Sequence, residues 1–323
     1  MLTFELVLTA FLAIVFAASL IASRAKIPYT LVLVFLGIAL AIASTFLLSQ
    51  GGFLGSIILQ LRQYSDRLTQ GGSEGLFVGL VIPPLIFEAM VHVKSSDLKA
   101  VIRPASYMAT IGVLVSTVVG GLLLWKLAQL PFYVSFLFAA LISPTDAATV
   151  LEIFRRAKVP SKLATMMNIE AAFNDATGIV IFTIVLASIS FPSLPIIQSV
   201  YNFSLVFGGG ILVGFSVAFV AELLSSLIEE RLSETILTIS AVYGSYVLAT
   251  GFGFSGLIAV AIVGLYFGNY TIRPAVAPGS RETITIFWQI AAFLGNSVAF
   301  LLIGLRTDLL KLSQSVELIA IAF

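Results

Sequence analysis

The stretch "TMMNIEAAFNDATGIVIFTIV", residues 165–185, is as apolar as a membrane-crossing helix, yet it carries Glu170, Asn174 and Asp175. About 20 predominantly apolar residues in helical form cross the ~30 Å hydrocarbon layer of a bilayer. A carboxylate inside such a segment costs at least a few kcal/mol unless it is neutralised or faces water or a partner. This stretch therefore predicts a membrane helix whose carboxylates have a function.

The composition extends this interpretation to the whole chain. Hydrophobic residues make up 59% of the 323 residues, charged residues only 10%, and the mean hydropathy is +1.10, whereas soluble domains carry roughly 25% charged residues. A transmembrane β-barrel would show ~10-residue alternating segments. Polar, Gly and Pro residues instead separate ten long apolar segments, with an eleventh beginning near Gln314, and no soluble domain fits between them. The sequence predicts an all-α polytopic membrane protein with spans at 2–22, 27–48, 75–91, 104–125, 132–153, 163–190, 200–227, 234–250, 253–270 and 284–305.

The basic residues predict how the protein is oriented. The first apolar segment carries Glu5 rather than a basic leader and runs into a second apolar segment, so it is interpreted as a span and not as a signal peptide. Twelve of the 17 Lys and Arg residues fall in odd-numbered connections, and basic loops stay on the cytoplasmic side. We expect a multi-pass protein of the cell membrane with its N-terminus outside.

Cysteine is absent, which excludes disulfides, thiolate nucleophiles and cysteine metal sites. The single histidine, His92, lies in a polar connection. We interpret it as a solvated loop residue, with a pH-sensing role as the alternative.

Most of the 16 acidic residues lie in loops or near the ends of spans, but four lie within apolar stretches whose spans contain no Lys or Arg to pair with them: Glu88, Asp146, Glu170 and Asp175. A proton, a metal cation or a distant Arg must balance their charge.

A proline accompanies one of these carboxylates. In "FLFAALISPTDAATVLEIF", residues 136–154, Pro144 lacks an amide donor and its ring clashes with the preceding turn. The helix should therefore break just before Thr145 and Asp146. Carbonyl groups freed at a membrane-embedded break must be buried in protein or line an aqueous cavity, and they are ligands that suit an alkali cation. A purely structural kink is the alternative.

The spacing along residues 165–185 separates two polar faces. Glu170 and Asn174 are four residues apart and lie on one face, within hydrogen-bonding reach. Asp175 is turned by roughly 100° from Asn174, one turn from Ala171. The alternative for the Glu–Asn pair is a buried polar contact that only holds helices together, whereas Asp175 has no partner in its own turn.

Glu88 follows "VIPPLIF", residues 81–87, where Pro83 and Pro84 are expected to disturb the helix. A residue near a span end that reaches for the membrane interface is the alternative interpretation of Glu88.

Several motifs carry a family resemblance: "PPLIFEAM" at 83–90, "SPTDAATV" at 143–150, "NIEAAFNDATGIVIF" at 168–182, "GLIAVAIVGLYFGNY" at 256–270 and "FWQIAAFLGNSVAFLLIGL" at 287–305. In this order they resemble the electroneutral, NhaP-like sodium/proton antiporters of the monovalent cation:proton antiporter family. The similarity runs from about Ile27 to Leu305. Electrogenic relatives carry Asp-Asp where this chain has Asn174-Asp175. In the family, Asn at the first of these positions is associated with the exchange of one cation for one proton.

The resemblance implies a role for each matching residue. Asp175 would alternately hold the cation and the proton, with Asp146 as a second Na⁺ ligand. Thr145, beside the Pro144 break, and Glu88 would help to coordinate the ion. Glu170 and Asn174 would support the site, usually with an Arg from a later span. The resemblance further implies a homodimer in the lipid bilayer that binds a monovalent cation and protons, needs no cofactor and binds no nucleic acid.

The resemblance also implies an inverted-repeat fold with broken, crossing helices, in which a core domain moves like an elevator against a dimerisation scaffold. The expected division is 1–91 as mainly scaffold with the third span contributing to the ion site, 104–190 as half of the core, 200–305 as scaffold and 314–323 as the start of a further core span.

Two departures from the family pattern stand out: Ala171 replaces a Ser hydroxyl that faces the ion in some members, and the sequence ends inside the eleventh span. In family members, which usually have about thirteen spans, the second broken helix and the pairing Arg belong to the last three spans, and Arg306 is not an evident substitute for this Arg.

Other functions fit less well. A K⁺/H⁺ antiporter is the nearest alternative, and a sodium-coupled symporter shares the broken helix. An intramembrane aspartyl protease would also place two Asp on neighbouring helices, but such enzymes carry Gly-x-Gly-Asp where this chain has Phe-Asn-Asp. A channel is disfavoured because no filter-like carbonyl run is present and "GFGFSG", residues 251–256, is interpreted as a tight bend. We therefore expect a Na⁺ (or Li⁺)/H⁺ antiporter and not an enzyme.

Overall fold

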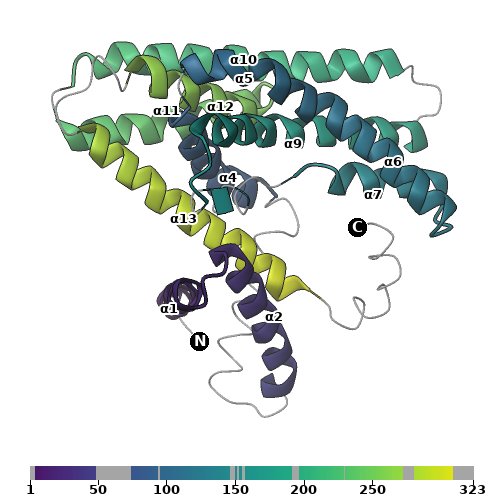
Figure 1. Cartoon of the computed structure of the whole chain (residues 1–323). Helices are drawn as coiled ribbons and strands as arrows, with labels where there is room; N and C mark the ends of the chain where they lie inside the picture. The colour runs from purple at the N-terminus through teal and green to yellow at the C-terminus, as the bar shows by residue number, and fades with distance from the viewer. Residues whose placement is uncertain are drawn as a thin grey trace. The chain divides into compact units, whose positions relative to one another are not determined.

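The computed structural model describes residues 4–48, 74–93, 95–145, 150, 153–154, 157–190, 196–228, 230–271 and 280–307. These residues form helices and turns and contain no strand. The elements are α1 (Phe4–Ala25), α2 (Tyr29–Leu48), α4 (Glu74–Val91), α5 (Ser95–Tyr107), the π-helical η1 (Met108–Gly112), α6 (Val113–Lys126), α7 (Phe132–Ile142), α9 (Ser161–Ser190), α10 (Ile196–Ser225), α11 (Arg231–Gly251), α12 (Gly256–Tyr266), the π-helical η2 (Phe267–Thr271) and α13 (Ser280–Arg306) (Figure 1).

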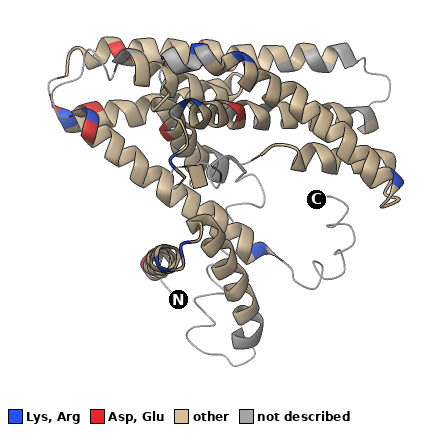
Figure 2. Ribbon diagram, viewed as in Figure 1, with Lys and Arg blue, Asp and Glu red and all other residues tan. Residues whose placement is uncertain are grey.

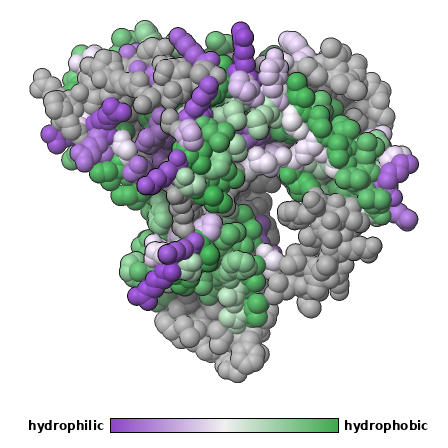
Figure 3. Space-filling model, viewed as in Figure 1, coloured by the Kyte–Doolittle hydropathy of each residue, from purple (hydrophilic) through white to green (hydrophobic). Residues whose placement is uncertain are grey.

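The predicted spans correspond to these helices. Within the described residues, five helical stretches are long and apolar enough to cross a membrane: Glu5–Ala25, Val101–Lys126, Ser204–Ser225, Arg231–Gly251 and Ser280–Arg306. Charged residues are sparse along the helices (Figure 2). The exposed surface over α6 is predominantly hydrophobic (Figure 3), as expected for a face that contacts lipid. The protein is therefore an integral, multi-pass membrane protein.

The fourth span begins earlier than its apolar segment predicts. The helix starts at Ser95 and continues through η1 and α6. Its first part, α5, is amphipathic and buries Val101 and Ala105 against Ile169 of α9. Hydropathy alone misses such a helix because only one of its faces is apolar.

Contacts divide the chain into two units, and α4 and α13 contribute residues to both. The first unit comprises Met1–Leu85 and Ile286–Leu312. Here α1 and α2 form a hairpin that buries Ala18, Ala22, Val32 and Leu33.

Two glycines let α2 and α13 approach closely in the first unit. A Cβ atom added to Gly304 would lie 2.2 Å from the Val34 carbonyl oxygen and 2.8 Å from the Gly37 Cα. Close backbone approach through small residues is a common way to pack helices in membranes. Nearby, the Tyr29 hydroxyl lies 2.7 Å from the Ser297 hydroxyl.

In the second unit (Ile86–Thr285 and Ser313–Phe323), α10, α11 and α12 contact one another, α6 contacts α7, and α9 contacts both α5 and α7. The predicted bend at residues 251–256 is confirmed: α11 ends at Gly251 and α12 begins at Gly256. Gly253 in this bend has a φ of +76°, a backbone conformation that glycine adopts readily.

One prediction about α4 is wrong. Pro83 and Pro84 were expected to disturb the helix, but α4 continues from Glu74 to Val91 through both prolines, which are buried. Membrane helices tolerate internal prolines where neighbouring groups and local adjustments satisfy the freed backbone atoms.

We predict that Gly304→Ala destabilises the protein. The added methyl group would meet main-chain atoms of α2, which cannot rotate away, and such overpacking typically costs ~1–3 kcal/mol. The melting temperature of the detergent-solubilised protein should fall. Gly244→Ala, at a helical position with nothing within 4 Å of the added Cβ, is the matched control and should not lower it. Equal melting temperatures for the two variants would contradict the close crossing.

Candidate cation site

The predicted break after α7 is present. The helix ends at Ile142, and the Ser143 N–H still donates to the Ala139 carbonyl at 3.0 Å. Pro144 has no N–H to offer the Ala140 carbonyl, so the chain leaves the helix at this point. Thr145 follows outside the helix and is exposed. The break thus frees backbone oxygen atoms close to the end of a membrane-embedded helix.

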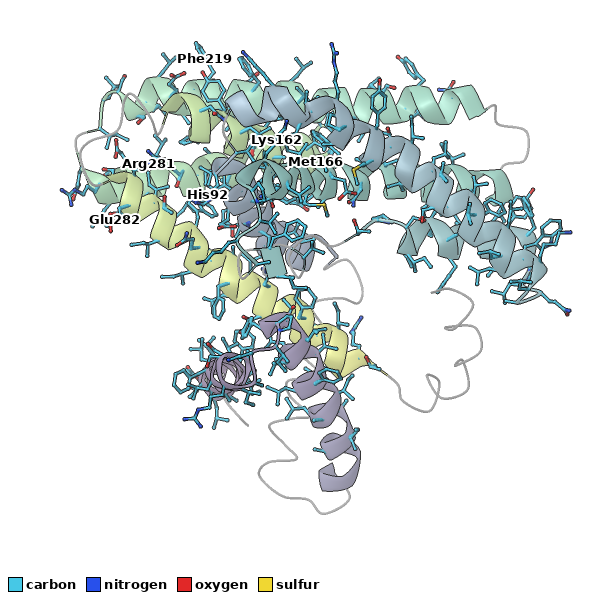
Figure 4. The ribbon with its side chains drawn as sticks, in the orientation of Figure 1. His92, Lys162, Met166, Phe219, Arg281 and Glu282 are labelled. Atoms are coloured by element: carbon cyan, nitrogen blue, oxygen red, sulfur yellow. The ribbon has the colours of Figure 1, made fainter. Side chains whose placement is uncertain are left out.

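One face of α9 is directed at this break. Glu170, Asn174 and Gly178 are spaced four residues apart and are all buried, with Asn174 0% and Glu170 5% exposed. Residues at this spacing lie above one another on a helix. Figure 4 marks the beginning of α9 by Lys162 and Met166.

The Asn174 amide connects α9 to the broken segment. Its Nδ2 lies 3.1 Å from the Thr145 carbonyl oxygen, 3.1 Å from the Thr145 hydroxyl and 2.8 Å from Glu170 Oε1. An amide group has only two N–H bonds, so these three acceptors share them. The Thr145 hydroxyl is also 3.4 Å from both carboxylate oxygens of Glu170. The predicted Glu170–Asn174 hydrogen bond is therefore confirmed, and Thr145 joins it.

Gly178 allows α9 to approach the break. A Cβ atom added there would lie 2.4 Å from Cγ of Pro144 and 3.2 Å from the Ala140 carbonyl oxygen. A side chain at this position would push the broken segment away from Asn174. Gly178 was not among the predicted site residues, although its place four residues after Asn174 was a signal.

The cluster of Glu170, Asn174 and Thr145 has more hydrogen-bond acceptors than donors. Glu170 contributes two carboxylate oxygens, Thr145 a carbonyl and a hydroxyl, and Asn174 an amide oxygen, whereas the donors are one amide and one hydroxyl. Asn174 Oδ1 is buried without a hydrogen-bond partner among the described residues. Within the same residues no Lys or Arg lies within ion-pair distance of Glu170. Such an excess of oxygen atoms suits a cation or a donor from elsewhere in the protein.

The other predicted ligands are placed only in part. Asp146 lies outside the described residues. The backbone of Asp175 belongs to α9, one residue beyond Asn174, and its side chain is not among those described. Their roles as ligands stay predictions.

Glu88 lies in the last turn of α4 and is near His92. His92 Nδ1 is 2.7 Å from the Glu88 carbonyl oxygen and 3.9 Å from the Glu88 carboxylate. His92 follows the end of α4 (Figure 4) and its side chain is 45% exposed, in agreement with a solvated residue.

The fold and the site define a polytopic membrane protein of the transporter class, with a proline-broken span beside a carboxylate-bearing span. A family model described as "Sodium/hydrogen exchanger, transmembrane" matches residues 7–323. The chain belongs to the sodium/hydrogen exchanger family, which is a family of transporters.

Individual relatives agree with this assignment. The chain is 32% identical to the low-affinity Na⁺/H⁺ antiporter NhaS1 of Synechocystis, over 99% of this chain and 56% of that protein. It is 33% identical to the Na⁺/H⁺ antiporter NhaP of Pseudomonas aeruginosa, over 72% of this chain and 56% of that protein. The chain thus spans about half the length of these curated relatives.

The fold also matches that of a solved structure. The sodium proton antiporter MjNhaP1 of Methanocaldococcus jannaschii has a TM-score of 0.68 and 24% sequence identity, over 96% of this chain and 72% of that chain. This likeness confirms the predicted antiporter fold.

We predict that Gly178→Ala lowers the melting temperature of the solubilised protein. Alanine favours a helix by about 1 kcal/mol over glycine, but here its methyl group would overlap the rigid ring of Pro144. Gly120→Ala in α6 is the control, because its added Cβ would make an ordinary 3.5 Å contact with Ala139 of α7. A higher melting temperature for Gly178→Ala than for the unmodified protein would contradict the close contact.

Proposed function

We propose that this protein exchanges Na⁺, or Li⁺, for H⁺ across the cell membrane, one for one. The observation that carries the proposal is the contact between the Pro144 break and α9, in which Asn174 holds Thr145. Asn174 immediately precedes Asp175. The Thr145 oxygen atoms at the break therefore lie beside α9, the helix that carries Asp175, and oxygen atoms of this kind are ligands for a partly dehydrated alkali cation.

Competition for one carboxylate is enough to produce exchange. Asp175 can carry a proton or a cation, but not both at once. The empty, charged form is costly to move through the membrane interior. Only the two loaded forms cross, so each cation that crosses in one direction is matched by a proton in the other.

Each residue has a distinct part in this proposal. Asp175 is the exchanging carboxylate, and Asp146 is a further ligand for Na⁺. Thr145 offers its carbonyl and hydroxyl oxygens, and Glu88 contributes from the third span. Glu170 and Asn174 hold the broken segment in place, and no cofactor takes part.

The larger movements follow the family resemblance. We propose that the spans within 104–190 belong to a core that moves like an elevator against the spans within 200–305. The first spans, within 1–91, would belong mainly to this scaffold, through which the protein forms a homodimer. The N-terminus would lie outside the cell, as the distribution of basic residues predicts.

Asp175→Asn should abolish cation-dependent proton movement, because an amide cannot alternate between a proton and a cation. The measurement is the collapse of a preset pH gradient in vesicles that contain the intact protein, after Na⁺ is added. Glu282→Gln, at an exposed position in the first turn of α13 (Figure 4), is the control and should exchange normally. Exchange by Asp175→Asn at the unmodified rate would refute the proposed role of Asp175.

Electroneutral exchange predicts that the rate does not depend on membrane potential. Na⁺, Li⁺ and K⁺ are added in turn to the same vesicles, with the potential clamped to zero or left free. Na⁺ or Li⁺ should dissipate the pH gradient equally fast in both states. A rate that changes with the clamp would contradict one-for-one exchange, and a response to K⁺ alone would identify the protein as a K⁺/H⁺ antiporter.

A further inference from the structure

A pair of buried hydroxyl groups connects α6 to the end of α7. Thr117 of α6 is 1% exposed and Ser143, directly after α7, is 9% exposed. The Thr117 hydroxyl donates to the Ser143 hydroxyl at 3.1 Å, and the Ser143 hydroxyl donates to the Ala139 carbonyl at 2.7 Å. The two hydroxyls thus form a short chain of hydrogen bonds that ends on a carbonyl of the last helical turn.

The direction of these two hydrogen bonds suits the end of a helix. The last carbonyls of a helix carry partial negative charge and lack donors. The Ala139 carbonyl oxygen accepts hydrogen bonds from both the backbone N–H and the hydroxyl of Ser143. Hydrogen bonds in series polarise one another, so the Thr117 donor strengthens the contact that ends α7.

Three consecutive residues of the break are therefore fixed by three different contacts. Ser143 is bound by Thr117 of α6. Pro144 rests against Gly178 of α9, and Thr145 accepts from Asn174 of the same helix. Loss of the Thr117 contact would leave the broken segment held from the α9 side alone.

We propose that Thr117 is a positioning residue for cation binding, which it performs through Ser143 without touching the ion. It fixes the end of α7 so that the Thr145 oxygen atoms stay where the cation needs them. This inference rests on the proposed function, since it assigns Thr117 to the same cation site.

The variant that isolates this contact is Thr117→Val. Valine keeps the shape of threonine but cannot donate, so the Ser143 hydroxyl loses its donor partner. Interhelical hydrogen bonds in membranes contribute on average ~0.6 and at most ~1.7 kcal/mol, which corresponds to a rise in KM for Na⁺ of about threefold to sixteenfold. A ligand position that shifts weakens binding of the cation first, so the maximal rate should stay within about twofold.

Two further variants separate positioning from general stability. Thr117→Ser keeps the donor and should restore the KM. Ser135→Ala removes an equally buried hydroxyl of α7, 0% exposed, which donates to the Pro131 carbonyl at 3.1 Å. It lies eight residues before Ser143, about 12 Å along the helix, and should leave the KM unchanged.

The experiment measures KM and maximal rate for Na⁺-dependent proton movement in vesicles for the intact protein and all three variants. A raised KM in Thr117→Val alone supports the positioning role. An unchanged KM in Thr117→Val, or an equal rise in Ser135→Ala, overturns it while exchange by the unmodified protein still supports the proposed function. No exchange by the unmodified protein overturns the proposed function and this role with it.

Discussion

The hydrogen bond from the Asn174 amide to the Thr145 carbonyl is the contact on which the site depends. A helix that breaks in an apolar layer exposes backbone groups, and each unsatisfied group there costs several kcal/mol. Pro144 lacks the N–H that would continue the helix, Asn174 supplies a donor to the Thr145 carbonyl beyond it, and Gly178 lets α9 come close enough for this contact. The same contact leaves the Thr145 oxygen atoms in a fixed place beside α9, so the groups that stabilise the break also position the proposed ligand.

The packing of the remaining spans follows from the same apolar lipid environment. Lipid tails are as apolar as leucine, so burial of hydrophobic side chains gives little attraction between membrane helices. The second unit relies instead on close backbone approach: a Cβ atom on Gly214 would lie 2.5 Å from the Ala259 carbonyl oxygen, and one on Gly268 only 2.1 Å from that of Val91. Short-range van der Waals contacts of this kind give the helices a defined register, which a site made from several spans requires.

The sequence predicted those features that depend on local chemistry. Length of apolar runs located the spans, and the missing amide of Pro144 located the break. The two prolines of α4 have the same chemistry, but α4 continues through them, because neighbouring groups decide whether a membrane helix breaks. The place of Thr145 beside Glu170, 25 residues away, and the role of Gly178 depend on how α7 and α9 pack. Four-residue spacing predicted the Glu170–Asn174 pair and could not identify the third partner.

An amide at position 174 joins Glu170 and the broken segment without adding a charge. Asn174 lies 2.8 Å from the Glu170 carboxylate and donates to it. A second carboxylate at this distance would repel Glu170, and one of the two would have to take up a proton or a cation. The amide instead satisfies Glu170 and the broken backbone without adding charge. Helical geometry turns Asp175 by roughly 100° away from this pair, so Asn174 adds no second exchanging carboxylate beside Asp175, in line with the one-for-one stoichiometry proposed here.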